Sequence, residues 1–160
     1  MPEKKQTVEP VAKKFWESKK LSQMSKSEWE SLCDGCGRCC LNKIEYEDTE
    51  GIFFTNVACK LLDSDSCRCK NYKNRHKQIP DCVSLTPGNI EELDYMPSTC
   101  AYRLLANNRP LPGWHPLITG DSESVHKAGI SVRGKTVSEE FFTDEDLEDN
   151  LIDWIKTELI

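Results

Sequence analysis

Residues 33–40 read CDGCGRCC, and the rest of the sequence is best understood outward from this stretch. Cys33, Cys36 and Cys39 follow one another at three-residue steps, and Cys40 comes directly after them. The two intervening glycines allow the tight backbone path that converging ligands need. Thiolates are soft donors that suit zinc, copper(I) and iron–sulfur clusters, so the stretch predicts a metal centre.

The adjacent cysteines at 39 and 40 indicate that this centre extends beyond the stretch itself. Neighbouring side chains tend to diverge and rarely reach one mononuclear metal together, so one of the pair is expected to face a second ligand group. The chain has nine cysteines, all of them within residues 33–100. The predicted metal ligands are Cys33, Cys36, Cys39, Cys40, Cys59, Cys67, Cys69, Cys82 and Cys100.

The spacing of these cysteines leaves the type of centre open. Eight thiolates could fill two four-thiolate zinc sites, or four could hold one iron–sulfur cluster while the others are structural. Cys100 comes last among the predicted ligands, because a cysteine inside an apolar helical run is more often a small core residue. A thiol switch that uses the adjacent pair is a further alternative.

Two familiar cysteine patterns do not match the sequence. The cysteine spacing of bacterial ferredoxins would require a further cysteine at position 43. That position is occupied by Lys43. A thioredoxin-type CxxC pair expects a preceding strand, whereas Cys33 follows a predicted helix. We therefore expect neither a ferredoxin-like ligation nor a thioredoxin-like redox pair.

Local patterns predict short elements on both sides of the cysteines. Ser25 and Glu28 form a capping-box pattern, which begins a short helix ending near Cys33. The run KIEYEDTEGIFFTN at residues 43–56 alternates around a glycine-containing turn and predicts a β-hairpin. Further elements are expected at residues 86–93 (helix), 100–107 (helix) and 130–137 (strand).

The length of 160 residues favours one domain. We expect an α+β fold, a small single domain of short helices and a small antiparallel sheet organised around a cysteine-rich metal centre. Residues 1–12 are polar and indicate a flexible leader, and residues 13–138 form the cysteine-cluster domain with its ligand-rich part at 33–100. Residues 139–160 predict an acidic amphipathic C-terminal helix.

Composition points to the cytoplasm. The sequence has no apolar run of 18 residues that could cross a membrane, and its polar start, MPEKKQTVEPVAKK, lacks the apolar stretch of a secretory signal. Cytoplasmic thiols are kept reduced, so nine cysteines, an odd number, are more naturally ligands or catalytic groups than a disulfide framework.

Charge is distributed unevenly. Residues 139–160 contain nine acidic residues against one lysine, whereas the rest of the chain carries a net charge of +2. That remainder has no basic stripe of the kind that binds a phosphate backbone, so nucleic-acid binding is not indicated. The acidic face of the C-terminal segment is expected to be solvated, with contact to a protein partner as the alternative.

Other polar residues near the cysteines are weaker candidates. His115 and His126 could ligate a metal, but packing and hydrogen bonding are the more common roles, and His76 is expected to be exposed. Asp34, Asp81 and Arg38 lie beside predicted ligands, where they could orient the cysteines or offset thiolate charge. The sequence has no Ser/His/Asp signature, P-loop or HExxH motif, so metal binding has more support than catalysis.

Several blocks in order resemble a known family, the YcgN-type cysteine-cluster proteins of bacteria, which belong to the zinc- or iron-chelating CxxCxxCC domain group. The blocks are FWESK, EWESLCDGCGRCCL, TNVACKLLD, CRCKNY, PDCVSLTP, TCAYRLL, WHPL and HKAGISVRG, from Phe15 to Gly134. The resemblance implies a small cytoplasmic protein whose CxxCxxCC cysteines are metal ligands. The wider group carries an Arg-Pro pair before a late cysteine, whereas this chain has Arg75 followed by His76.

Three functional hypotheses follow. The first is a metal-binding protein, with structural zinc or with an iron–sulfur centre for electron transfer or sensing. The second is an enzyme that modifies a protein or small molecule, because the wider group resembled here includes a flagellin lysine methylase; no Rossmann-type cofactor motif supports it. The third is an adaptor with a structural metal that binds partners through its acidic C-terminal helix.

Overall fold

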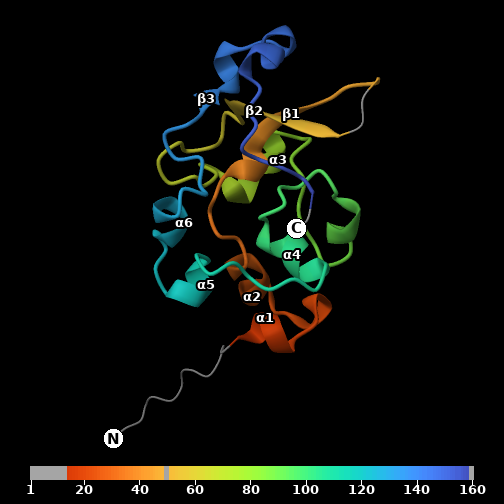
Figure 1. Ribbon diagram of the computed structural model, residues 1–160, viewed down its shortest axis with the longest axis vertical. Coiled ribbons are helices and arrows are strands. Elements are labelled where there is room, and N and C mark those ends of the chain that lie inside the picture. The colour runs from red at the N-terminus through yellow and green to blue at the C-terminus, as the bar shows by residue number, and fades with distance from the viewer. Residues whose placement is uncertain (1–13, 49–50, 159–160) are drawn as a thin grey trace, which may run out of the picture.

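The computed structural model describes residues 14–48 and 51–158, and the leader expected at 1–12 lies outside them. The molecule is elongated, with a small sheet at one end of its long axis and the N-terminal helices at the other (Figure 1). The loop at residues 33–40, orange in Figure 1, runs between these two ends. The predicted α+β class is confirmed.

The N-terminal helices position the start of the cysteine loop. α1 (Phe15–Ser18) and α2 (Lys26–Ser31) are short, and a 3-10 turn lies between them. Ser25 caps α2 as predicted, because its side chain accepts from the Glu28 amide at 3.1 Å while the Glu28 carboxylate accepts from the Ser25 amide at 2.9 Å.

The sheet follows the cysteine loop directly. β1 (Leu41–Glu45) and β2 (Ile52–Ala58) pair antiparallel, which confirms the predicted hairpin, although positions 49 and 50 at its turn lie outside the described residues. β3 (Val137–Ser138) pairs parallel with β2, so the sheet is mixed rather than purely antiparallel. Most of the strand predicted at 130–137 is irregular, with a turn at Arg133 and Gly134, because Val132 enters the core and the chain bends at Gly134.

The long connection between β2 and β3 consists of short helices. Its α-helices are α3 (Arg75–Gln78), α4 (Ala101–Ala106), α5 (Pro116–Thr119) and α6 (Ser124–Lys127). The 3-10 helices of the described chain are Leu21–Gln23, Arg38–Cys40, Tyr72–Asn74, Ile90–Glu92, Glu139–Phe141 and Asp144–Asn150. The helix predicted at 100–107 is confirmed as α4, whereas the one predicted at 86–93 is reduced to a turn and a 3-10 helix.

The C-terminal segment differs from the amphipathic helix that the sequence predicts for residues 139–160. It forms 3-10 turns and then extends along β2, where the Ile152 amide donates to the Phe54 carbonyl at 3.0 Å. Five acidic residues fall within 144–149, and like charges three or four positions apart destabilise an α-helix. The extended path also allows Ile155 to be buried against the sheet.

Buried apolar side chains form two separate clusters, one at each end of the cysteine loop. The sheet cluster comprises Leu41, Phe54, Ala58, Leu62, Cys67, Val132 and Ile155, with Cys40 packed against it. The helical cluster comprises Phe15, Leu32, Ile90 and Tyr102, with Cys100 among the partly buried residues packed against it. The cysteine loop therefore links two small cores.

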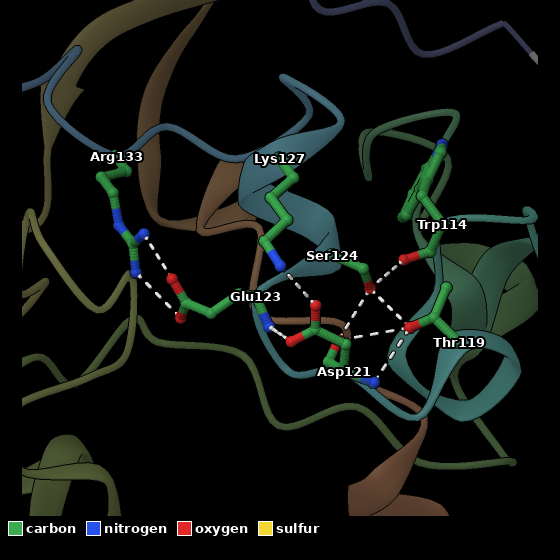
Figure 2. A network of polar contacts seen from close by, with 7 residues as sticks. All are labelled: Trp114, Thr119, Asp121, Glu123, Ser124, Lys127 and Arg133. Atoms are coloured by element: carbon green, nitrogen blue, oxygen red, sulfur yellow. Dashed lines mark hydrogen bonds and ion pairs between the residues drawn. The ribbon is translucent and has the colours of Figure 1, made fainter.

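A polar network joins the α5–α6 segment to Arg133 (Figure 2). Arg133 forms an ion pair with Glu123, at 2.9 Å between Nη1 and Oε1, and its Nε donates to the Asp65 carbonyl at 2.5 Å. Lys127 pairs with Asp121 at 2.7 Å, and Ser124 donates to the Trp114 carbonyl at 2.6 Å. Exposed ion pairs add little stability, so the network mainly fixes how these loops are placed.

No helix within residues 14–48 and 51–158 combines the length and the apolar character that a membrane span needs.

Candidate metal centre

The backbone of the cysteine loop turns sharply at two glycines. Gly35 and Gly37 adopt left-handed conformations, with φ of 81° and 76°, which L-residues with a side chain rarely adopt. Between them, the Cys36 amide donates to Asp34 Oδ1 at 3.0 Å. A Cβ on Gly37 would also lie 2.8 Å from Val132 Cγ2, so the loop is packed closely against the rest of the domain.

His115 contacts the backbone at the start of this loop. Its side chain is fully buried; Nε2 lies 2.7 Å from the Leu32 carbonyl, and Nδ1 accepts from the Leu117 amide at 3.0 Å. Because a carbonyl only accepts, Nε2 carries the proton and the imidazole is neutral, and burial lowers the pKa of His115 in agreement. Both ring nitrogens are engaged by the backbone, so His115 supports the loop rather than binding metal.

The other two histidines also have hydrogen-bond partners. His126 Nδ1 lies 2.7 Å from Ser131 Oγ, and His76 Nε2 lies 3.2 Å from Ser84 Oγ. His76 is exposed, as the sequence predicts.

Seven of the nine predicted cysteine ligands line one cavity of about 810 Å³. They are Cys33, Cys39, Cys40, Cys59, Cys67, Cys69 and Cys82. Cys33 and Cys39 line this cavity, whereas Cys36 is buried and does not line it. Thiols that are separated by up to 49 positions in the sequence therefore line one cavity.

Cys100 packs near the start of the cysteine loop. It lies at the N-terminus of α4 and packs on the helical cluster that contains Leu32. Arg38 Nη1 approaches Thr99 Oγ1 at 3.5 Å, which links the residue before Cys100 to the loop. Burial raises the pKa of Cys100 to about 12, and the charges of Cys39 and Cys33 add to this effect. We call Cys33, Cys36, Cys39 and Cys100 the first cysteine group.

A second set of cysteines lies across the hairpin. The Cys59 amide donates to the Cys40 carbonyl at 2.8 Å, which extends the β1–β2 pairing, and Cys69 forms an isolated bridge with Leu62. Cys82 lines the same cavity. Burial raises the pKa of Cys59, and the charges of Cys69 and Cys82 add to this. We call Cys40, Cys59, Cys69 and Cys82 the second cysteine group.

Cys39 and Cys40 join the two groups. The interaction between their side chains lowers the pKa of Cys39 and raises that of Cys40. Burial and the charges of Cys39, Cys59 and Cys82 raise the pKa of Cys40 further. Burial also raises the pKa of Cys36 and brings that of Cys33 to about 11. Most of these thiols therefore keep their protons at neutral pH in the metal-free fold.

Cys67 lies beside Gly37 of the cysteine loop, where a Cβ on the glycine would be 3.1 Å from Cys67 Cβ. It packs inside the sheet cluster in a left-handed conformation, with φ of 60°, and only 4% of it is exposed. Burial raises its pKa, and a hydrogen bond with the Ser131 side chain opposes that rise. Its surroundings are those of a core residue.

Two basic side chains face the cysteines. Arg68 Nη1 lies 3.6 Å from Cys33 Sγ, and its guanidinium covers Gly35 so closely that a Cβ there would lie 3.0 Å from Nη2. Lys43 Nζ donates to the carbonyls of Cys39 and Leu41 at 3.1 and 2.8 Å. Sequence reasoning singled out neither residue for this role. Arg38, which it did single out, donates instead to the Ile130 carbonyl at 2.8 Å.

The donor set fits a thiophilic metal. All eight side chains of the two groups are thiols, and Asp34 Oδ2 is buried without a hydrogen-bond partner among the described residues. Within residues 14–48 and 51–158, no three side chains of His, Cys, Asp or Glu are gathered closely enough to hold an ion as they stand. Binding therefore requires the thiols to draw together.

Comparison with known proteins identifies the family. The chain is 55% identical over 141 residues to a "UPF0260 protein" of Rhodopseudomonas palustris, covering 88% of this chain and 83% of that protein. It is 59% identical to a protein of the same description from Rhizorhabdus wittichii, over 88% of this chain and 95% of the relative. The chain belongs to the UPF0260 family. A further UPF0260 protein, from Allorhizobium ampelinum, is 53% identical over 91% and 92% of the two chains.

The central part of this UPF0260 protein also matches a domain family. Residues 32–101 match the family CxxCxxCC, described as "Putative zinc- or iron-chelating domain". The resemblance predicted from CDGCGRCC and its flanking blocks is confirmed, and the matched range includes all nine cysteines. No solved structure is significantly similar to the chain.

Proposed function

We propose that this UPF0260 protein is a cytoplasmic metal-binding protein whose zinc or iron is held by thiolates of the cysteine loop. The observation that carries the proposal is the gathering of separated cysteines around one cavity, next to a loop whose backbone is fixed by two left-handed glycines. The match of residues 32–101 to a domain family described as zinc- or iron-chelating gives further support.

The first cysteine group supplies the ligands of this centre. Cys33, Cys36 and Cys39 come from the loop, and Cys100 comes from the start of α4, which is brought to the loop by the helical cluster. Four thiolates complete the coordination of a structural zinc ion, and four also hold an iron–sulfur cluster. The metal would crosslink the loop to α4, and iron would add the capacity for electron transfer or sensing.

Metal content of the purified protein tests this proposal. Full-length protein purified without oxygen should contain stoichiometric zinc or iron, and broad visible absorption would identify an iron–sulfur centre. Cys36→Ser should lower the metal content, while Ser66→Ala, an exposed change in the same domain, should leave it unchanged. Wild-type protein that contains no metal, and takes up none when reduced, would contradict the proposal.

A further inference from the structure

We infer that the second cysteine group, Cys40, Cys59, Cys69 and Cys82, forms a second metal site, separate from the first and adjoining it at the Cys39–Cys40 peptide. This inference rests on the proposed function, because it assumes that the cysteine loop binds metal. It assigns eight thiols to two sites of four and leaves Cys67 to the core.

The β-hairpin provides the frame for this second site. β1 begins directly after Cys40 and β2 ends directly before Cys59, and the two cysteines are joined by the 2.8 Å hydrogen bond from the Cys59 amide to the Cys40 carbonyl. Side chains at paired positions lie on the same face of a ladder, within about 5.5 Å at Cβ. Two of the four ligands are therefore fixed by the fold itself.

The chain that follows Cys59 brings Cys69 and Cys82 to the same cavity. The Lys70 amide donates to the Leu61 carbonyl at 2.6 Å, and the Leu62–Cys69 bridge brings the third cysteine beside the end of β2. Cys82 reaches the cavity from beyond α3, where its amide donates to the Ile79 carbonyl at 3.0 Å. All four members of the group line the cavity, whereas only Cys33 and Cys39 of the first group do.

A basic side chain without an acidic partner gives an independent indication of a charged centre here. Lys43 lies on β1, with Nζ 5.0 Å from the centre of the Phe54 ring and 5.9 Å from that of Tyr95. Among the residues that the structure describes, no carboxylate forms an ion pair with it. Its Nζ donates to the carbonyls of Cys39 and Leu41, and a divalent metal bound by four thiolates, with a net charge of about −2, would add a favourable charge interaction.

The two sites adjoin because Cys39 and Cys40 are consecutive in the chain. Cys100, which completes the first group, packs on the helical cluster, and Cys40 packs on the sheet cluster. Each site would thus include a cysteine that packs on one of the two small cores. The peptide between Cys39 and Cys40 would connect the two sites.

Zinc stoichiometry of matched variants tests the inference. Reduced, metal-free, full-length protein would be loaded with zinc, separated from unbound ion, and analysed for zinc per chain. Wild type and Cys67→Ser are expected to bind two ions, whereas Cys36→Ser and Cys59→Ser each retain one. The cadmium forms provide a second count, because thiolate-to-cadmium charge-transfer absorbance should fall to about half in each single-site variant.

The outcomes separate the two proposals. If wild type binds one ion and both Cys36→Ser and Cys59→Ser lose it, the second site is contradicted and the proposed function stands. If Cys59→Ser still binds two ions, the second site is likewise contradicted. Wild type that binds none would overturn both. If Cys59→Ser does not fold, Cys69→Ser and Cys82→Ser carry the same expectation, and loss of one ion in either supports the inference.

Discussion

The two cysteine groups each contain four thiols, but their members are distributed differently along the sequence. Three members of the first group lie within seven residues of chain, on a loop shaped by the local contact between the Cys36 amide and Asp34 and supported from a distant segment by His115. The second group draws its members from four places along residues 40–82, and the β-hairpin brings them together. A local group depends on its loop conformation, whereas a dispersed group depends on the tertiary fold. The two should therefore respond differently to perturbation.

The largest expected effect is a pH dependence of metal binding at the first group. With pKa values raised to about 11 at Cys33 and about 12 at Cys100, and with that of Cys36 raised as well, these thiols are protonated at neutral pH in the metal-free fold. The interaction with Cys40 lowers the pKa of Cys39, so this thiol contributes least to the count of bound protons. Binding thus displaces about three protons, so the affinity should fall roughly a thousandfold per unit decrease in pH.

Zinc competition with a chelator, measured in the Cys59→Ser variant between pH 6 and 8, would check this dependence. A flat profile would contradict it. The metal-free fold should show the opposite trend, because a raised thiol pKa contributes stability below the ordinary value of 9.0 and loses it as pH rises through the raised value. Metal-free protein should therefore unfold more readily above about pH 9, as followed by circular dichroism.

A substitution at His115 should separate the two groups. His115→Ala leaves the Leu32 carbonyl and the Leu117 amide without their buried partner, which should lower the free energy of unfolding by about 3 kcal/mol. Because Leu32 precedes Cys33, zinc affinity should fall at the first group and change little at the second.

Chemical denaturation and zinc titration would measure both effects, with His76→Ala as the exposed control. Equal loss of affinity at both groups would show that His115 supports the whole domain rather than the loop.

The comparison also shows where sequence reasoning succeeds and where it stops. CDGCGRCC, the capping box at Ser25 and the hairpin are local patterns, and each predicts its own structure because the responsible contacts lie within a few residues. The assignment of Cys100 to the first group depends on α4 packing against Leu32, a contact between distant segments that no spacing reveals. The C-terminal apolar residues likewise fit a helical stripe, but the sheet edge offers them a better burial site in an extended path.

The sequence gives still less indication that the side chains of Lys43 and Arg68 face the cysteines. A lysine in a β-strand with alternating residues predicts an exposed side chain, and only the fold shows its ammonium turned toward the carbonyls of Cys39 and Leu41. Arg68 lies between two cysteines, which is suggestive, but its contact with Cys33 spans 35 positions in sequence.

The smallest expected effect is at Lys43. Lys43→Met keeps the apolar stem and removes the charge, so metal affinity should fall about tenfold, as for other residues that support metal ligands. The metal-free protein should be equally stable or slightly more so, because an ammonium without a described acidic partner is removed. Zinc titration and denaturation of the metal-free form would measure the two changes, with the exposed Lys73→Met as control. Lower stability with unchanged affinity would show a packing role instead.

X-ray absorption spectroscopy at the metal edge of the anaerobically purified protein tests the central claim most directly. Ligation by the two cysteine groups predicts a sulfur-only first shell at about 2.3 Å, with no histidine contribution, because His115 is engaged by the backbone on both ring nitrogens. A first shell made half or more of nitrogen or oxygen, near 2.0–2.1 Å as an approximate range, would contradict thiolate ligation by these cysteines.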